Sequence, residues 1–178
     1  VGHTVTQGSD GNLYGTTGCC GTTEHGSVFK ITPGGVETQL YAFPTTGSNG
    51  NEPYAGLVQG SDGNFYGTTY LGGANGFGTV FRVTPAGTET VLYSFAGGND
   101  AANPYSGLIQ ASDGNFYGTT AGGGAHGYGT IFRVTPGGAQ SVLYSFPSGG
   151  SSPYAGLTQG SDGNFYGTTL CCGSSEHG

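Results

Sequence analysis

Residues 61–69 read Ser-Asp-Gly-Asn-Phe-Tyr-Gly-Thr-Thr, and this phrase, once with Leu in place of Phe, occurs four times in the chain. Its aspartates follow one another at intervals of 52, 51 and 49 residues. Gly and Asn tolerate positive φ, and Asp accepts backbone N–H bonds, so Asp-Gly-Asn favours a tight hairpin turn. The phrase therefore predicts a hairpin turn and a following strand, repeated in tandem. Its aspartates are Asp10, Asp62, Asp113 and Asp162.

Further fixed words in each repeat predict three more strands. The run Val-Phe-Arg-Val-Thr-Pro ends at Pro85 in the second repeat, where the strand must stop because proline cannot donate to a ladder. The word Leu-Tyr-Ser-Phe follows, and Pro-Tyr-(Ala/Ser)-Gly-Leu opens the next repeat. About 50 residues and four antiparallel strands is the size of one propeller blade. In the second repeat the strands are expected over 56–59, 65–71, 79–84 and 90–95.

These units predict an all-β fold of tandem four-stranded antiparallel blades in a propeller-like array. The apolar faces of neighbouring units would stack into one continuous core. A β-solenoid or a stacked β ribbon is the alternative, although loops of 7 to 11 residues suit blades better. The expected units are repeat 1 over 1–52, repeat 2 over 53–103, repeat 3 over 104–152, and the first half of repeat 4 over 153–178.

The last half-unit restarts the first, because residues 160–178 follow the wording of residues 8–26 three units earlier. We expect that these units cannot close a ring by themselves, since closed propellers typically have 4 to 8 blades. An open half-unit leaves a strand edge that is a template for β addition from another chain. The sequence therefore predicts self-association into a polymer or a longer array.

Composition excludes several classes of function. The chain has 40 Gly among 178 residues, only 7% charged residues, and a net charge of −7. Three Lys and Arg cannot supply the basic stripe that a nucleic-acid partner needs, so none is expected. Membrane insertion is not expected either, because no run of about 20 apolar residues occurs. The 12 Tyr and 10 Phe are available for a packed core, which argues against disorder.

The fixed words occur in a fixed order over nearly the whole chain, as in residues 57–69, 78–85 and 92–95. In this order they resemble the GloVer-type tandem repeats of secreted bacterial proteins with varied C-terminal anchors. The resemblance implies a repeat architecture and an extracellular or cell-surface location, and it implies no known activity. The chain departs from the usual pattern at two Cys-Cys pairs, where such repeats more often carry small residues.

Those pairs are the first candidate for chemistry. Cys19 and Cys20 lie three units before Cys171 and Cys172, in matched loops, and the middle units lack them. We expect disulfides in an oxidising compartment, within a pair or between subunits that join head to tail. Three connectivities are open, and free thiols are the alternative.

No cofactor is required by the sequence, but the turn aspartates offer the oxygen ligands that calcium prefers. Calcium at Asp10, Asp62, Asp113 and Asp162 is one hypothesis, and an Asp that only fixes its own turn is the other. Tyr54, Tyr105 and Tyr154 follow Pro at the unit junctions, where we expect them to pack between blades or to stack on sugars. Thr pairs such as Thr68-Thr69 are candidate O-glycan sites.

No enzyme activity is expected, because the chain lacks a G-x-S-x-G elbow, an HExxH motif and a phosphate-binding loop. The predicted function is structural. The chain would be a subunit or segment of an extracellular bacterial filament or surface assembly, joined by β pairing and disulfides. The alternative is a cell-surface propeller-type binding module that recognises a glycan or a protein.

Overall fold

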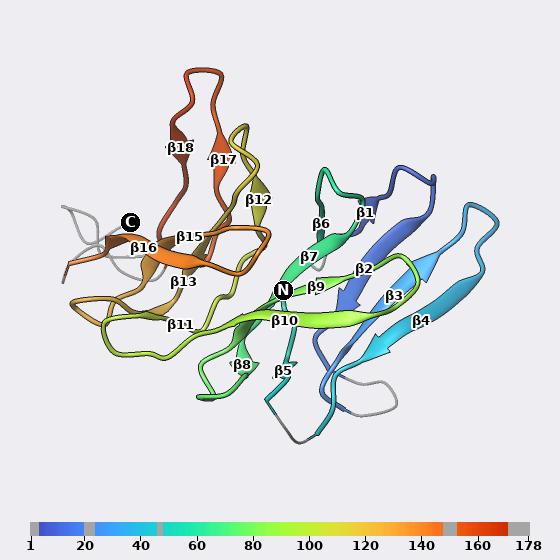
Figure 1. The fold of residues 1–178 in the computed structure, drawn as a ribbon, viewed down its shortest axis with the longest axis horizontal. Helices are drawn as coiled ribbons and strands as arrows, with labels where there is room; N and C mark the ends of the chain where they lie inside the picture. Colours follow the sequence, from blue (N-terminus) through green and yellow to red (C-terminus); the bar gives the residue numbers. More distant parts are fainter. Residues whose placement is uncertain (1–3, 20–23, 46–47, 148–152, 171–178) are drawn as a thin grey trace.

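The computed structural model describes residues 4–19, 24–45, 48–147 and 153–170, and these segments contain strands but no helix. Accordingly, no helix in them is long and apolar enough to cross a membrane. Three four-stranded antiparallel sheets and a shorter hairpin follow one another along the chain (Figure 1). The predicted all-β, propeller-like fold is confirmed.

Each sheet is an antiparallel meander in which strand order follows chain order. The first sheet holds β1 (Thr6–Gln7), β2 (Leu13–Thr17), β3 (Ser27–Ile31) and β4 (Glu37–Ala42). The second holds β6 (Val58–Gln59), β7 (Phe65–Thr69), β9 (Thr79–Val83) and β10 (Glu89–Ser94). The third holds β12 (Ile109–Gln110), β13 (Phe116–Thr120), β15 (Thr130–Val134) and β16 (Gln140–Ser145), and β17 (Thr158–Gln159) pairs with β18 (Phe165–Tyr166).

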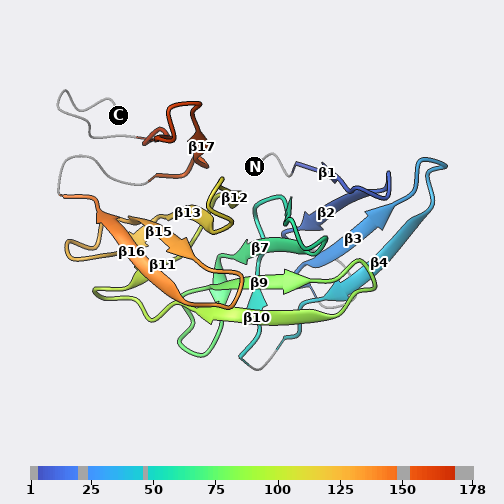
Figure 2. The ribbon, with the colours of Figure 1, turned by 45° about the horizontal axis from the view of Figure 1, so that its top comes forward.

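The sheets stand side by side along an arc, with their short first strands on its inner side and β4, β10 and β16 on its outer side (Figure 2). Two small ribbons connect neighbouring units, and sequence reasoning did not anticipate them. One pairs β5 (Gly50–Asn51) with β8 (Leu71–Gly72), and the other pairs β11 (Ala101–Ala102) with β14 (Gly122–Gly123). These ribbons add backbone hydrogen bonds between neighbouring units.

The Asp-Gly-Asn phrase forms the turn between the first and second strands of every unit. In the second unit, Gly63 has a φ of 80°, and one Asp62 oxygen accepts the backbone N–H of Asn64 at 3.1 Å. The other Asp62 oxygen accepts the Asn64 side-chain amide at 2.7 Å and the Tyr66 hydroxyl at 2.9 Å. Asp10, Asp113 and Asp162 make the same three bonds in their own turns.

The tyrosine held by this turn joins its unit to the next one. The ring of Tyr66 stacks on that of Phe116 with centroids 3.9 Å apart, and Tyr14 stacks on Phe65 at the same distance. Tyr66 is only 1% exposed. Burial, followed by the Asp62 carboxylate, raises the pKa of Tyr66 to about 12, so its hydroxyl stays protonated as a donor.

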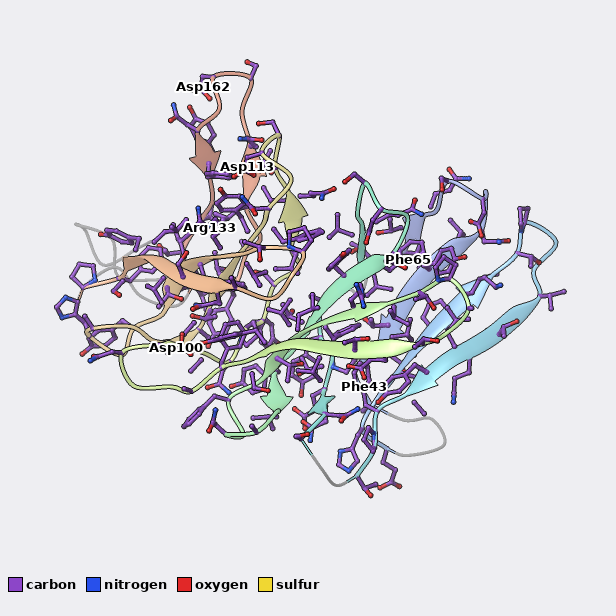
Figure 3. All side chains as sticks on the ribbon, viewed as in Figure 1. Phe43, Phe65, Asp100, Asp113, Arg133 and Asp162 are labelled. Carbon is purple, nitrogen blue, oxygen red and sulfur yellow. The ribbon has the colours of Figure 1, made fainter. Side chains whose placement is uncertain are left out.

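A second aromatic contact fills the space between units. The third-strand phenylalanine lies over the glycine of the neighbouring second strand, so a Cβ on Gly67 would lie 2.7 Å from Cζ of Phe81. Phe81 also meets Phe43 of the preceding unit edge to face, with centroids 5.2 Å apart. Phe43 and Phe65 accordingly lie between the first two sheets in Figure 3. The third unit repeats the pattern, with Phe132 over Gly118 and against Phe95 at 5.1 Å.

We predict that Tyr66→Phe destabilises the fold far more than Tyr166→Phe. Both changes remove one hydroxyl bond to an aspartate, but Tyr66 is buried and Tyr166 is 57% exposed. A hydrogen bond to a charged group is worth about 1.5–3 kcal/mol, whereas surface changes usually stay within about 0.5 kcal/mol. Urea unfolding of the two variants measures this difference. Equal losses would contradict the interpretation.

We also predict a loss of stability at acid pH. Partial burial raises the pKa of Asp62, but the bonds from Asn64 and Tyr66 outweigh it and hold this pKa below the ordinary 3.8. A lowered native pKa gives stability that is present above pH 3.8 and is lost as the pH falls through the native value. Melting temperatures measured from pH 5 to pH 2 should therefore fall less steeply in Asp62→Asn, which cannot titrate there. A variant as acid-sensitive as the parent would contradict this account.

Candidate ligand site at the inner tyrosine cluster

The Pro-Tyr-x-Gly-Leu segments bring successive units together on the inner side of the arc. A Cβ on Gly56 would lie 2.6 Å from the carbonyl oxygen of Thr4, and one on Gly107 would lie 3.4 Å from that of Gly56. The first of these distances is too short for any side chain, so glycine is required there for the backbones to approach. The tyrosines that precede these glycines therefore lie close together.

Four tyrosines gather there, and we call Tyr54, Tyr70, Tyr105 and Tyr154 the tyrosine cluster. Tyr105 lies in its middle, with ring centroids 5.3 Å from Tyr54, 4.9 Å from Tyr154 and 5.8 Å from Tyr70. Tyr70 also contacts Tyr54 at 5.5 Å. Tyr54 and Tyr105 are part-buried, whereas Tyr154 is 40% exposed. The cluster therefore combines a packed base with an aromatic ring open to solvent.

Two hollows adjoin the cluster. The first, which we call the inner hollow, has a volume of about 250 Å³. The second has a volume of about 380 Å³ and shares two tyrosines with it, Tyr105 and Tyr154. The remaining lining of the inner hollow is Thr4, Tyr54, Ala55, Gly56, Leu57, Ser106, Gly107, Leu108 and Gly156, and that of the second hollow is Tyr70 and Leu170.

The lining of the two hollows carries no charged side chain within the described residues. A charged side chain contacts this lining from outside it: the carboxylate of Glu52 accepts a hydrogen bond from the Tyr54 hydroxyl at 2.6 Å. This bond, with burial, raises the pKa of Tyr54 to about 12, so the phenol is neutral at physiological pH. The Tyr54 hydroxyl thus donates its hydrogen bond to Glu52. Its oxygen lone pairs and the face of its ring are then available to a ligand.

Glu52 is held by backbone hydrogen bonds in an unfavourable backbone conformation. Its φ is 57°, in the left-handed region that residues other than Gly rarely adopt. Its N–H donates to the carbonyl of His25, and its own carbonyl accepts from Tyr70 N–H. Asn103, at the same place in the next unit, has a φ of 56° and donates its side-chain amide to the Tyr70 carbonyl at 3.0 Å. Units one and two therefore both fix the position of Tyr70.

The turn aspartates lie apart from the cluster. Each carboxylate already accepts the three bonds of its own turn, as described above for Asp62. Within the described ranges, no three His, Cys, Asp or Glu residues come close enough to hold a metal ion together. The hydrogen bonds that these carboxylates already accept do not favour calcium binding. Calcium at Asp10, Asp62, Asp113 and Asp162 therefore stays a prediction.

Of the predicted cysteine sites, only Cys19 lies within the described residues, where it is exposed. Cys20, Cys171 and Cys172 lie outside them, so the predicted disulfides stay predictions. Thr68 and Thr69 were candidate O-glycan sites, and their side chains are 1% and 0% exposed, which does not favour a glycan on this pair. The Thr69 hydroxyl instead bonds that of Thr79 at 2.8 Å inside the sheet.

Sequence reasoning singled out three of the four clustered tyrosines and missed Tyr70. The signal was present, since Tyr70 follows Tyr-Gly-Thr-Thr, where the other units carry Gly18, Ala121 and Leu170. A large aromatic residue at one copy of a repeated position marks a place where the repeat is not uniform. Only the convergence of the inner segments shows that this residue joins the other three.

Comparisons with known proteins agree with the repeat architecture. Residues 2–178 match the profile of the Gloeobacter/Verrucomicrobia repeat. No curated protein matches the sequence significantly. Among solved structures, the X-ray structure of a protein provisionally named a gluconolactonase matches with a TM-score of 0.59 and 15% identity. The match covers 93% of this chain and 54% of that one, so the chain spans about half the length of this structure, and the likeness concerns the fold alone.

Proposed function

Because the chain belongs to the Gloeobacter/Verrucomicrobia repeat family and folds as a propeller-like array, we propose that it is a repeat-built binding module for neutral glycans outside the cell. The observation that carries this proposal is the tyrosine cluster beside an uncharged hollow on the inner side of the arc. Ligand sites are typically concave, with aromatic walls and a few placed polar groups.

The chemistry of the hollow favours a sugar over other ligands. Tyrosine offers a rigid, amphipathic contact area at low entropic cost, and the open ring of Tyr154 provides such a face. Backbone groups of the inner glycines border the hollow, where sugar hydroxyls would find partners. An anionic ligand would find no cation in the lining, and the −7 charge of the chain would repel it.

We propose binding without catalysis. The name of the structural neighbour concerns that protein, and at 15% identity it transfers no activity to this chain. Within the described lining the titratable side chains are tyrosines, and Tyr54 is held neutral by Glu52. General acid–base chemistry needs a group with a pKa near the working pH, which a phenol with a pKa of about 12 does not provide.

A structural role in an extracellular assembly is the second candidate. It is favoured by β18, which within the described part of the chain pairs with β17 and with no other strand. A strand edge of this kind pairs with a further strand, from the same chain or from another one. The predicted disulfides would strengthen such an assembly in an oxidising environment.

We predict that Tyr154→Ala weakens glycan binding while Tyr128→Ala does not. The two rings are 40% and 43% exposed, but Tyr128 lies outside the hollows, so the pair separates ring exposure from ring position. Loss of an aromatic anchor should cost at least about 1 kcal/mol, or about fivefold in affinity. Immobilised neutral hexose oligosaccharides are the probe, with bound protein measured by interferometry. Equal binding by both variants, or none by the parent, would contradict the proposal.

A further inference from the structure

The turn between the third and fourth strands of the second unit packs on the first unit. A Cβ on Gly87, in this turn, would lie 2.6 Å from the carbonyl oxygen of Leu40 in β4. Figures 1 and 2 show the β9–β10 hairpin reaching across to β4. Because β10 begins directly after the turn, its first residue, Glu89, lies at the junction between the two units.

Two polar side chains of the first unit meet Glu89 there, and we call Tyr41, Asn49 and Glu89 the junction triad. The Asn49 side-chain amide donates to the Tyr41 hydroxyl oxygen at 2.6 Å and to Glu89 Oε2 at 3.3 Å. The Tyr41 hydroxyl in turn donates a hydrogen bond to the Glu89 carboxyl. The triad therefore joins a carboxyl of the second unit to a phenol and an amide of the first.

One oxygen of the Glu89 carboxylate has no donor. Oε1 is buried and has no hydrogen-bond partner in the described part of the chain. The other charged side chains in the strands of these two sheets are Lys30, Glu37 and Arg82, and none of them is among the groups that act on Glu89. A buried polar atom without a partner costs free energy, and it costs more when the group is charged. The ionised form of Glu89 is therefore unfavourable at this junction.

The second junction has a different arrangement of the same kinds of group. Gln140 begins the fourth strand of the third unit as Glu89 begins that of the second. Its Nε2 is also buried without a partner, at a lower cost because an amide is neutral. The carboxylate here belongs to Asp100, whose Oδ2 accepts the Tyr93 hydroxyl at 2.9 Å and the Ala96 N–H at 2.8 Å. The position of Glu89 thus accommodates an uncharged side chain of nearly the same shape.

We propose that Glu89 is a pH-sensitive switch at the junction of the first two units, which is tight while this carboxyl is protonated and loosens when it is ionised. Burial, which outweighs the bond from Tyr41, raises the pKa of Glu89 above its ordinary 4.5. A raised native pKa gives stability that is full below pH 4.5 and is lost as the pH rises through the native value. The turn carboxylate of Asp62 acts in the opposite direction, because its stability is lost below pH 3.8.

The substitution Glu89→Gln tests the switch, with Glu37→Gln as the matched control. Glu37 begins the fourth strand of the first unit and is exposed. Urea unfolding at pH 4 and pH 7 compares both variants with the parent. The gain of Glu89→Gln in the ratio of folded to unfolded protein should be at least about threefold larger at pH 7 than at pH 4. The turn aspartates are the same in all three proteins, so their effect cancels, and Glu37→Gln should show no such difference.

Titration of the carboxyl carbons by NMR measures the switch without a substitution. The chain has five Glu, and the signal that disappears in Glu89→Gln identifies the carboxyl in question. We expect its midpoint above pH 4.5. A midpoint at or below this value would overturn the proposal, as would the same dependence of stability on pH in Glu89→Gln and in the parent.

Amide exchange shows whether the effect lies at this junction. The Gly73 N–H donates to the Asn49 carbonyl at 3.0 Å, and the Gly124 N–H donates to the Asp100 carbonyl at 2.7 Å across the second junction. At pH 7, Gly73 should exchange more slowly in Glu89→Gln than in the parent, while Gly124 keeps its rate. An unchanged Gly73, or equal slowing of both amides, would overturn the proposal. The triad shares no residue with the two hollows, so the result does not depend on glycan binding.

Discussion

The structure depends on one interaction that recurs at each junction, the stack of a turn-anchored tyrosine on the phenylalanine of the next unit. The aspartate of the turn accepts a hydrogen bond from the tyrosine hydroxyl and so fixes the position of the ring. The ring centroids of Tyr14 and Phe65, and those of Tyr66 and Phe116, are then 3.9 Å apart. The third junction repeats it at 4.3 Å, between Tyr117 and Phe165. A chain with 7% charged residues has few ion pairs to use, so aromatic packing orders the units.

This ordering produces the proposed ligand site. Because successive units stack on their faces, their inner segments converge, and the tyrosines after Pro53, Pro104 and Pro153 gather beside a hollow. The inner hollow offers polar backbone groups and aromatic rings. It therefore suits a sugar.

The sequence was sufficient for the parts that repeat. The turn at Asp62, the end of the third strand before Pro85, and the antiparallel order of the strands follow from local residue chemistry. The predicted first strand, 56–59, shortens to Val58–Gln59, and Gly56 lies against the backbone of Thr4 in the preceding unit. The ribbons, the buried threonines and the place of Tyr70 depend on contacts between units, which a pattern within one unit does not contain.

A double-mutant cycle on Tyr66 and Phe116 measures the central interaction most directly. The single changes to Ala and the double change would be compared by urea unfolding of the full chain. Stacked aromatic pairs contribute about 0.5–1.5 kcal/mol beyond their burial, and a coupling energy in this range between the two sites is the expected result. Additive losses, with no coupling, would contradict the view that tyrosine–phenylalanine stacking orders the units.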